Sequence, residues 1–462
     1  MTIKFGTDGW RAIVGKDFTQ QNVTQIIEAF AAIYPTLPEA GRPVVIGYDM
    51  RNQSPETATL IAELLAARGI TPILSRDFCP TPAVAWTVVR QHAAAGIMVT
   101  ASHNPPEWNG IKFKESYGGA ASPEFTNPIE QQIQKGAAAA SACPAVSLQS
   151  FDPKHEYLNH LRNFVDGTAI AKARFKILFD PLYGSGASYL AQMIDGVTEI
   201  HGQRDLRFGG IHPEPIVPYV NEAIQTMRGG QYDVCIITDG DADRIGAIDE
   251  RGTYLTSHEI YGLLLQHVLT HRGWRGNVVK SITTTRMING LCRQFGLQLT
   301  TTPVGFKYIS PALKGPNMLV GGEESGGIGF PRHVCERDGL LCGLLILEMM
   351  AVRGKPLSAL VAELQTTYGP CRYRRVDLKL TPEQMQLAKA RLANLAVTSL
   401  CGRPIEKIER IDGYHLLRDD ESWLLIRPSG TEPLLRTYAE ARTDADVAAL
   451  LQEAQRMIGL AE

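Results

Sequence analysis

The feature that most constrains the fold is an alternation of short apolar runs with longer amphipathic runs in the first part of the chain. "PVVIGYD", "TPILS" and "AGIMVTAS" are short and apolar, which is typical of buried strands. Between the first two lies "SPETATLIAELLAARGI", with apolar residues at helical spacing, Ser54 as the predicted N-cap and a glycine near its end. "AVAWTVVRQHA" is also a candidate helix. We therefore expect a largely parallel sheet with helices on its faces.

The same pattern restarts twice along the chain, which predicts several domains of similar design. With 462 residues and roughly 100–200 residues per domain, about three or four domains are expected. After "TTYGPCRYRR" the pattern changes to antiparallel strands around turns, followed by a helix. The predicted fold class is therefore α/β, with three similar mixed or parallel α/β domains followed by a C-terminal α+β domain. The predicted boundaries are 1–143, 144–253, 254–370 and 371–462.

The composition argues against several classes of protein. The net charge is −2, so there is no global basic excess and nucleic-acid binding is not expected. The N-terminus lacks the pattern of a signal peptide. The most apolar run, "GLLCGLLILEMMAV", contains Glu348 and predicts a buried helix rather than a membrane span. The eight cysteines are scattered without a CxxC pair, which favours free thiols and a cytoplasmic location.

Three carboxylates alternate in "TDGDADR", directly after the apolar run "VCIIT". Asp239, Asp241 and Asp243 repel one another unless a cation lies between them, and oxygen ligands suit a hard ion such as Mg²⁺. The alternative is a solvated acidic loop. An EF-hand loop is rejected, because Arg244 occupies the sixth position, where that loop needs glycine.

Two further stretches combine hydroxyls with turns. "TASHNPPEWNGIKF" places Ser102 directly after a predicted strand, where it either acts as a nucleophile or caps a helix or ties a turn. "GGEESGG" holds two carboxylates and a hydroxyl among four glycines. Glycines let the backbone approach a ligand, and paired acceptors suit vicinal sugar hydroxyls, although a flexible surface turn is the alternative.

The last motif, "RPSGTEPLLR", has the groups that bind a phosphate dianion. It offers a guanidinium, two hydroxyls and backbone N–H groups in a tight turn, with Arg436 as an additional charge, and an ordinary hairpin turn is the alternative. Its candidate phosphate ligands are Arg427, Ser429, Gly430 and Thr431. In contrast, "YGSGAS" lacks the third glycine of a dinucleotide fingerprint, so a nicotinamide site is rejected.

Together and in this order, the motifs resemble those of the α-D-phosphohexomutase superfamily, which includes phosphoglucomutases, phosphomannomutases and phosphoglucosamine mutases. The resemblance covers essentially the whole chain, from "FGTDGWR" through "TASHNPPEWNGIKF", "DGDADR" and "GGEESGG" to "RPSGTEPLLR". It implies an enzyme in which each domain supplies one motif to a central cleft.

The resemblance implies a phosphoserine at Ser102 that gives its phosphoryl group to a bound hexose monophosphate. A bisphosphate then turns over in the site and returns its other phosphate to the serine, so that phosphate moves between the 1 and 6 positions. One Mg²⁺ per active site is expected, with glucose 1,6-bisphosphate as activator and intermediate. The implied metal ligands are Ser102, Asp239, Asp241 and Asp243.

The resemblance also assigns roles to other side chains. The implied catalytic residues besides Ser102 are Arg11, Lys112 (a candidate general acid/base), His103 and Arg244. The implied substrate ligands are Glu323, Ser325, Lys307, Arg427, Ser429, Gly430 and Thr431. Structural alternatives remain for three of them: a hydrogen bond for His103, an ion pair with the neighbouring aspartates for Arg244, and a surface position for Lys307.

The details of the motifs favour glucose phosphate as substrate. "EES" resembles phosphoglucomutases, whereas phosphoglucosamine mutases typically have Glu-Gln-Ser followed by Gly-His, and this chain has Gly327 in place of that histidine. Dual-specificity members typically have Ser-Asn-Thr where this chain has "SGT". His333 is a candidate substitute for the missing base, with a surface position as the alternative. A phosphomannomutase or a dual enzyme is the second choice, and a phosphoglucosamine mutase the third.

Two rival functions belong to other classes. In an aspartyl-phosphate phosphotransferase, Asp239 would carry the phosphate instead of Ser102. A non-catalytic sugar-phosphate binder would have lost one of the catalytic residues, and all are present. The only partner expected is a hexose phosphate, without nucleic acid or membrane, in a monomer or a homodimer.

Overall fold

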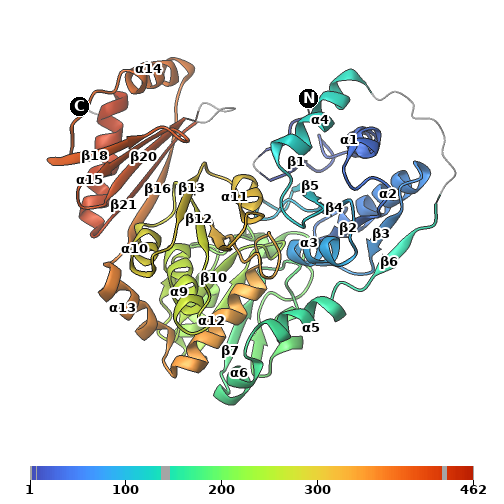
Figure 1. Ribbon diagram of the computed structural model, residues 1–462, viewed down its shortest axis with the longest axis horizontal. Coiled ribbons are helices and arrows are strands. Elements are labelled where there is room, and N and C mark those ends of the chain that lie inside the picture. Colours follow the sequence, from blue (N-terminus) through green and yellow to red (C-terminus); the bar gives the residue numbers. More distant parts are fainter. Residues whose placement is uncertain (1–2, 7, 137–145, 429–433, 461–462) are drawn as a thin grey trace.

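The computed structural model describes residues 3–6, 8–136, 146–428 and 434–460. Its strands form four sheets in the described residues, which follow the four predicted domains with two differences: residues 149–151 join the first sheet and residues 254–255 join the second. The domain boundaries remain a proposal. Figure 1 shows the first domain in blue on one side, the fourth in orange and red on the other, and the second and third between them.

The first sheet is mixed. Its parallel part consists of the three predicted strands, β2 (Val44–Tyr48), β3 (Pro72–Ser75) and β4 (Ala95–Val99), and of β6 (Gln149–Phe151), which the pattern does not predict. Strands β5 (Trp108–Glu115) and β1 (Trp10–Ile13) run antiparallel at one edge. The sheet order is β1, β5, β4, β2, β3 and β6. The accompanying helices are α1 (Gln20–Ile33), η1 (Tyr34–Thr36), α2 (Ser54–Ala67), α3 (Thr81–Arg90) and α4 (Pro123–Lys135).

Helix α2 lies where its periodicity predicts, but the predicted N-cap is wrong. Gln53, in the left-handed region with φ 63°, is the N-cap, and Ser54 is the first helical residue. The Ser54 hydroxyl donates to Asp49 Oδ1 at 2.7 Å instead of capping the helix. Because a buried carboxylate is stable only with hydrogen-bond donors, the Ser54 hydroxyl is oriented toward Asp49 and not toward the helix N-terminus.

The second and third domains repeat a parallel core with antiparallel strands at an edge. The second sheet has the order β11 (Tyr254–Leu255), β10 (Ile245–Asp249), β9 (Val234–Thr238), β7 (Ile177–Asp180) and β8 (Val197–Glu199). The third has the order β13 (Leu299–Thr302), β12 (Asn277–Ser281), β14 (Met318–Gly322) and β15 (Ile328–Gly329). Their helices are α5 (His155–Phe164), α6 (Gly167–Ala173), α7 (Tyr189–Met193), η2 (Phe208–Gly210), α8 (Asn221–Arg228), α9 (Ser257–Thr270), α10 (Arg286–Phe295), α11 (Phe306–Leu313), α12 (Gly339–Arg353) and α13 (Leu357–Tyr368).

Helix α12 is the buried helix predicted from "GLLCGLLILEMMAV". Its residues from Gly339 to Met350 are buried, and they belong to a core that is shared by the first three domains. No helix in the described residues is long and apolar enough to cross a membrane. The described cysteines are free, as predicted, namely Cys79, Cys235, Cys292, Cys335, Cys342, Cys371 and Cys401.

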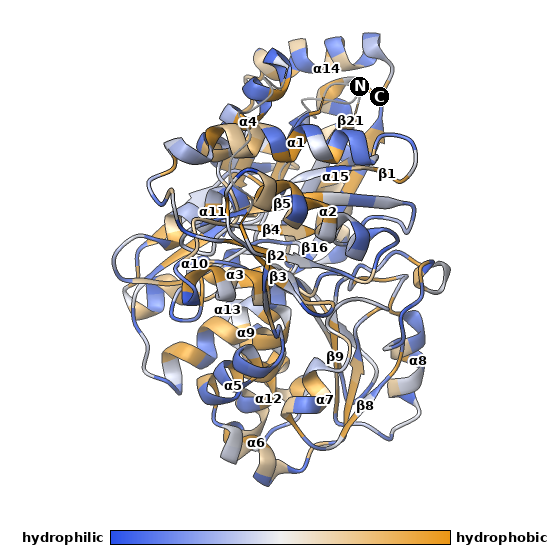
Figure 2. Cartoon of the chain, turned by 90° about the vertical axis from the view of Figure 1, so that its right-hand side faces the viewer, coloured by the Kyte–Doolittle hydropathy of each residue, from blue (hydrophilic) through white to orange (hydrophobic). Residues whose placement is uncertain are grey.

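The fourth domain is antiparallel, as the change of pattern predicts. Its strands lie in the order β16 (Arg372–Lys379), β21 (Leu434–Ala441), β20 (Trp423–Pro428), β19 (Tyr414–Arg418), β18 (Arg403–Glu409) and β17 (Ser399–Leu400). Helices α14 (Pro382–Ala393) and α15 (Asp444–Ile458) pack on it and share its core. Figure 2 shows hydrophilic and hydrophobic residues alternating along α14, as expected for a helix with one buried face.

Candidate functional site

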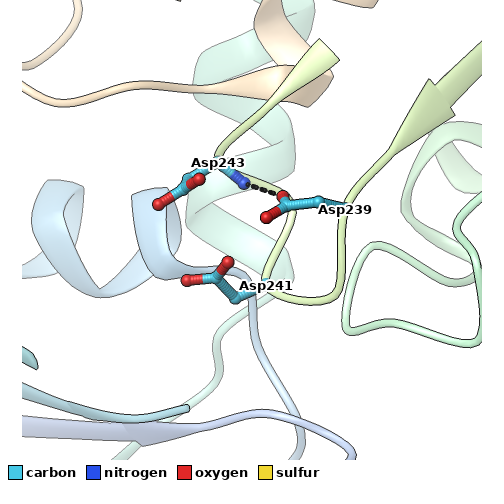
Figure 3. A group of neighbouring side chains, drawn as sticks. All are labelled: Asp239, Asp241 and Asp243. Carbon is cyan, nitrogen blue, oxygen red and sulfur yellow. Dashed lines mark hydrogen bonds between the residues drawn. The ribbon is translucent and has the colours of Figure 1, made fainter. Parts of the chain in front are cut away.

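The acidic loop lies between two antiparallel strands, β9 and β10. Asp239, Asp241 and Asp243 are completely buried, and their ligand oxygens lie within 4.8 Å of one another. Figure 3 shows the three side chains around the turn, with the Asp243 backbone N–H donating to Asp239 Oδ1 at 3.0 Å. This burial excludes the alternative of a solvated acidic loop.

Two buried oxygens of this cluster have no hydrogen-bond partner among the residues that the structure describes. They are Asp241 Oδ1 and Asp243 Oδ1. Burial, followed by the charges of Asp241 and Asp243, raises the pKa of Asp239 well above its usual range. Unpartnered buried carboxylate oxygens fit a hard divalent cation, so the three aspartates could hold Mg²⁺.

The Lys112 ammonium balances much of this negative charge. Its Nζ lies 2.8 Å from Asp241 Oδ2, 2.9 Å from Asp243 Oδ2 and 2.7 Å from Asp8 Oδ2. Burial opposes a charged lysine, but these carboxylates outweigh it and raise the pKa of Lys112 above its usual range. Lys112 on β5 of the first domain thus meets the acidic loop of the second.

Ser102 lies beside the acidic loop. Its Oγ donates to Asp239 Oδ2 at 2.8 Å, and the residue is buried. Its backbone is left-handed, with φ 53°, which is uncommon for a non-glycine residue and is concentrated at functional positions. Ser102 therefore caps no helix; it is presented to a carboxylate of the next domain.

A glycine permits the two loops to meet. A Cβ atom on Gly240 would lie 2.4 Å from the Ser102 carbonyl oxygen, far closer than such atoms approach. The contact between the serine loop and the acidic loop thus requires glycine at this position.

The serine loop is held in shape by Arg51, which the motif analysis missed. Its Nη2 donates to the carbonyl oxygens of Ser102 and Asn104, both at 2.6 Å, and its Nη1 donates to those of Pro105 and Trp108. Burial lowers the pKa of Arg51 to about 10. One signal for it was available, because Arg51 follows β2 at the same sheet edge where Ser102 follows β4.

The other residues expected beside the serine are close to it. Arg11 on β1 donates to Asn104 Oδ1 at 2.5 Å. His103 Nδ1 lies 3.4 Å from Ser102 Oγ, and burial, with the charges of Arg244 and Arg11 next, holds the pKa of His103 well below its usual range. Arg244 donates to Glu214 Oε1 at 3.1 Å, whereas its Nε lies 4.0 Å from Asp239 Oδ2. Its main ionic partner is therefore Glu214 rather than a neighbouring aspartate.

In the third domain, the two glutamates of "GGEESGG" have separate environments. Glu323 Oε1 accepts from Ser325 Oγ at 2.7 Å and from Arg337 Nη1 at 3.1 Å. Glu324 Oε2 accepts from the hydroxyls of Ser281, at 2.9 Å, and Thr283. The two carboxylates thus do not act as a pair, and only Glu323 joins the cluster around Arg337.

Arg337 is the most connected residue that sequence reasoning missed. Its Nη2 lies 2.5 Å from Asp8 Oδ2 and 2.7 Å from Asp243 Oδ2, so its guanidinium links three domains. A Cβ atom on Gly327 would lie 2.2 Å from Arg337 Cδ, so the arginine stem lies where a side chain at position 327 would begin. Its position just before the Asp338 N-cap of α12 was the available signal.

His333 does not replace the missing histidine, and its predicted surface position is wrong. The residue is buried. Its Nε2 lies 2.9 Å from Asp338 Oδ2 and its Nδ1 lies 2.9 Å from His160 Nε2, so both ring nitrogens are engaged in the core. A buried carboxylate, which also caps α12, draws the imidazole inward.

The phosphate-binding candidates lie on the third and fourth domains. Lys307 at the start of α11 donates to the Gly6 carbonyl at 3.3 Å, and Arg427 at the end of β20 donates to Asp412 Oδ1 at 2.8 Å. Arg436 on β21 is the register partner of Arg427 and lies 3.7 Å from Asp377 Oδ2. The remaining candidates, Ser429, Gly430 and Thr431, lie outside the described residues.

Neither of two sizeable cavities belongs to this site. One, of about 520 Å³, lies beside α6 and α7, and another, of about 460 Å³, lies between the third and fourth domains. Ser102 and the three aspartates line neither of them. The charged side chains of the site pack against one another instead.

Family models match all four domains of this chain. They describe phosphoglucomutase/phosphomannomutase α/β/α domains I, II and III, at residues 2–140, 155–252 and 256–368, and the C-terminal domain, at residues 378–456. A phosphoglucomutase/phosphomannomutase from Thermococcus kodakarensis is 30% identical, over 95% of each chain. A phosphoglucomutase from Komagataeibacter xylinus is 27% identical, over 99% of this chain and 90% of the relative.

A solved structure agrees with these relatives. The protein from Thermus thermophilus, to which a phosphomannomutase activity is attributed, superposes with a TM-score of 0.87 at 30% identity, over 99% of each chain. The chain therefore belongs to the α-D-phosphohexomutase superfamily, in its phosphoglucomutase/phosphomannomutase family. It is a phosphohexomutase, an isomerase of carbohydrate metabolism that acts on a hexose phosphate.

Proposed function

We propose that this phosphohexomutase is a phosphoglucomutase, which interconverts glucose 1-phosphate and glucose 6-phosphate with Ser102 as the phosphoryl carrier. The observation that carries this proposal is the position of Ser102 Oγ, 2.8 Å from Asp239 Oδ2 in a buried acidic loop. A serine hydroxyl in a left-handed backbone conformation, beside carboxylates that could hold a cation, is well placed for phosphoryl transfer.

In the proposed reaction, a hydroxyl oxygen of the bound hexose monophosphate attacks the phosphorus on Ser102. The bond from phosphorus to Ser102 Oγ breaks as the bond to the sugar oxygen forms. Lys112, whose raised pKa keeps it charged, is the proposed acid/base: its ammonium gives a proton to Ser102 Oγ and regains one from the sugar hydroxyl. The resulting glucose 1,6-bisphosphate reorients, and the serine then accepts its other phosphoryl group. Mg²⁺ on Ser102, Asp239, Asp241 and Asp243 would neutralise charge on the transferred group.

The surrounding residues supply binding and charge. Arg11 and Arg244 balance the phosphate on the serine, while His103 contributes a neutral hydrogen-bonding group. Glu323 and Ser325, already joined by a hydrogen bond, are proposed to bind the sugar hydroxyls. The proposed ligands of the non-reacting phosphate are Lys307, Arg427, Ser429, Gly430 and Thr431.

The preference for glucose rests on "EES" and on Gly327, whose neighbouring space holds the Arg337 stem. A dual phosphoglucomutase/phosphomannomutase is the second candidate, because the relative from Thermococcus kodakarensis carries both names. A relative from Methanopyrus kandleri, 30% identical, is assigned as a phosphoglucosamine mutase, so that sugar belongs in the test.

The test is a mutase assay with Mg²⁺ and a trace of glucose 1,6-bisphosphate. The 1-phosphates of glucose, mannose and glucosamine are compared at equal concentration by kcat/KM. We expect glucose to exceed the other two sugars by about tenfold or more, a difference of one good polar contact. Equal mannose turnover would make the enzyme dual, and no turnover with any sugar would favour a non-catalytic binder.

A further inference from the structure

Asp412 lies in the turn between β18 and β19 of the fourth domain. Its two carboxylate oxygens accept hydrogen bonds from two different domains. Its Oδ1 accepts from Arg427 Nε at 2.8 Å within the fourth domain. Its Oδ2 accepts from the backbone N–H of Val304 in the third domain at 3.0 Å. One side chain thus joins a proposed phosphate ligand to the neighbouring domain.

The turn that carries Asp412 is held against the strand of Arg427. Gly413 has φ 103°, and a Cβ atom there would lie 2.5 Å from the Ile426 carbonyl oxygen. Only glycine allows this approach, so the backbone itself brings the Asp412 carboxylate beside Arg427.

The other partner of Asp412 leads to a second proposed phosphate ligand. Val304 packs against a cluster that includes Trp423 and Tyr438 of the fourth domain. Three residues further on, Lys307 reaches the Gly6 carbonyl oxygen of the first domain. Docking of the Val304 loop on the fourth domain therefore fixes the base of the helix that carries Lys307.

We propose that Asp412 is a positioning residue that orients Arg427 for the substrate phosphate and couples phosphate binding to the docking of the fourth domain on the third. Asp412 accepts from Nε of the guanidinium, which fixes its orientation, and the two Nη groups can then pair with phosphate oxygens in a bidentate manner. The inference rests on the proposed function, because it takes Arg427 as a phosphate ligand.

The test measures phosphate binding in Asp412→Ala and Asp412→Asn of the full chain. We expect KM for glucose 1-phosphate, and Ki for inorganic phosphate, to rise about tenfold in Asp412→Ala, as for the loss of one charge-assisted hydrogen bond. We expect kcat to change less than about threefold, since the reacting atoms are untouched. Asp412→Asn retains an acceptor and should fall between wild type and alanine.

A double-mutant cycle separates positioning from a merely structural role. If Asp412 acts through Arg427, the variant Asp412→Ala/Arg427→Ala binds phosphate as weakly as Arg427→Ala alone. The Val304 amide should also exchange with deuterium faster in Asp412→Ala. Asp419→Ala, at an exposed position in the next turn, is the matched control and should match wild type in both measurements.

Unchanged KM and Ki in Asp412→Ala, or effects that add fully in the double variant, would overturn the inference. Because binding of inorganic phosphate is also measurable without turnover, by calorimetry, these outcomes are independent of the mutase assay. If the wild-type protein binds inorganic phosphate but does not convert any hexose 1-phosphate, the proposed function is overturned instead. If Asp412→Ala does not fold, Asp412→Asn carries the test.

Discussion

At the scale of single residues, Ser102 has a conformation and a hydrogen bond that a serine with only a turn-forming role would not require. The residue is buried, left-handed and hydrogen-bonded to Asp239 of another domain. A backbone held in a sparsely populated region persists where the surroundings impose it, as Arg51 does here through four carbonyl oxygens.

Ser102→Ala should reduce mutase kcat by about a thousandfold or more, because the carrier oxygen is gone. The thermal midpoint should change by only a few degrees, since one hydroxyl contributes about 1 kcal/mol. Steady-state assays and thermal melting check both expectations, with Ser150→Ala, on an edge strand, as the control. Near-normal turnover in Ser102→Ala would exclude the serine as carrier.

Spacing within one motif predicts which of its side chains lie together, whereas contacts between distant motifs cannot be predicted in this way. The spacing of Asp239, Asp241 and Asp243 predicts a group that could hold a cation, which the geometry confirms. Arg337 and Asp8 are far apart in the chain, and their contact depends on how the domains pack. Local sequence carries no signal for that contact, so reasoning from motifs missed both.

At the scale of elements, periodicity predicts where strands and helices lie better than it predicts strand direction or caps. β2, β3 and β4 are parallel as expected, yet β5 runs antiparallel to β4. Strand β5 itself was not predicted, because its sequence WNGIKFKE contains two lysines and follows a stretch rich in turn residues. Ser54 shows the same limit for caps, because Asp49 draws its hydroxyl away.

Gly240→Ala tests the contact between the serine loop and the acidic loop. The added methyl group would lie 2.4 Å from the Ser102 carbonyl oxygen, so the loops must separate. We expect kcat/KM to fall by roughly a hundredfold, as for a small misplacement of reacting groups. Gly167→Ala is the control, because the nearest atom to its added methyl group would be 3.9 Å away. Equal activity in the two variants contradicts this account of the contact.

Glu348 on α12 gives the helix packing a dependence on pH. Burial opposes its ionisation, but hydrogen bonds from His267, Arg272 and the Asp166 backbone outweigh it and lower the pKa of Glu348 to about 2. A lowered pKa in the folded state means that the stabilisation is present above the unfolded-state pKa of about 4.5 and is lost as pH falls toward 2.

We therefore expect Glu348→Gln to unfold at a lower urea concentration than wild type at pH 6. The difference between their midpoints should shrink as pH falls below about 4.5, because the Glu348 carboxylate of unfolded wild type then binds a proton that the folded protein takes up only near pH 2. Urea unfolding at several pH values checks this, with the exposed Glu156→Gln as the control. A difference that stays constant down to pH 3 would count against the charge as the cause.

At the scale of the whole molecule, side chains that cross domain boundaries fix the arrangement shown in Figure 1. Glu440 of the fourth domain is one of them. Its buried carboxylate accepts from Thr285 Oγ1 at 2.9 Å and from the Arg286 backbone N–H at the start of α10, and also from Trp423 Nε1 at 3.0 Å. The fold class of each domain could be predicted from sequence, whereas a contact between residues 285 and 440 could not.

Glu440→Ala should weaken the docking of the fourth domain by about 3 kcal/mol, because it leaves several buried donors without an acceptor. Hydrogen exchange should then be faster around Thr285 and in β21, while the core of α15 keeps its protection. Glu453→Ala on α15 is the control, since its partner Arg456 is on the same helix. Unchanged exchange at the α10 terminus in Glu440→Ala would refute the role of this carboxylate.

The central claim is that Ser102, and not Asp239, carries the phosphoryl group. The most direct measurement loads the protein with phosphate from glucose 1,6-bisphosphate, treats half with hydroxylamine, and maps the modified residue by peptide mass spectrometry. Our account predicts a phosphate on Ser102 that survives hydroxylamine, because a phosphate ester does not react with it as an acyl phosphate does. A hydroxylamine-labile phosphate on Asp239 would contradict the account.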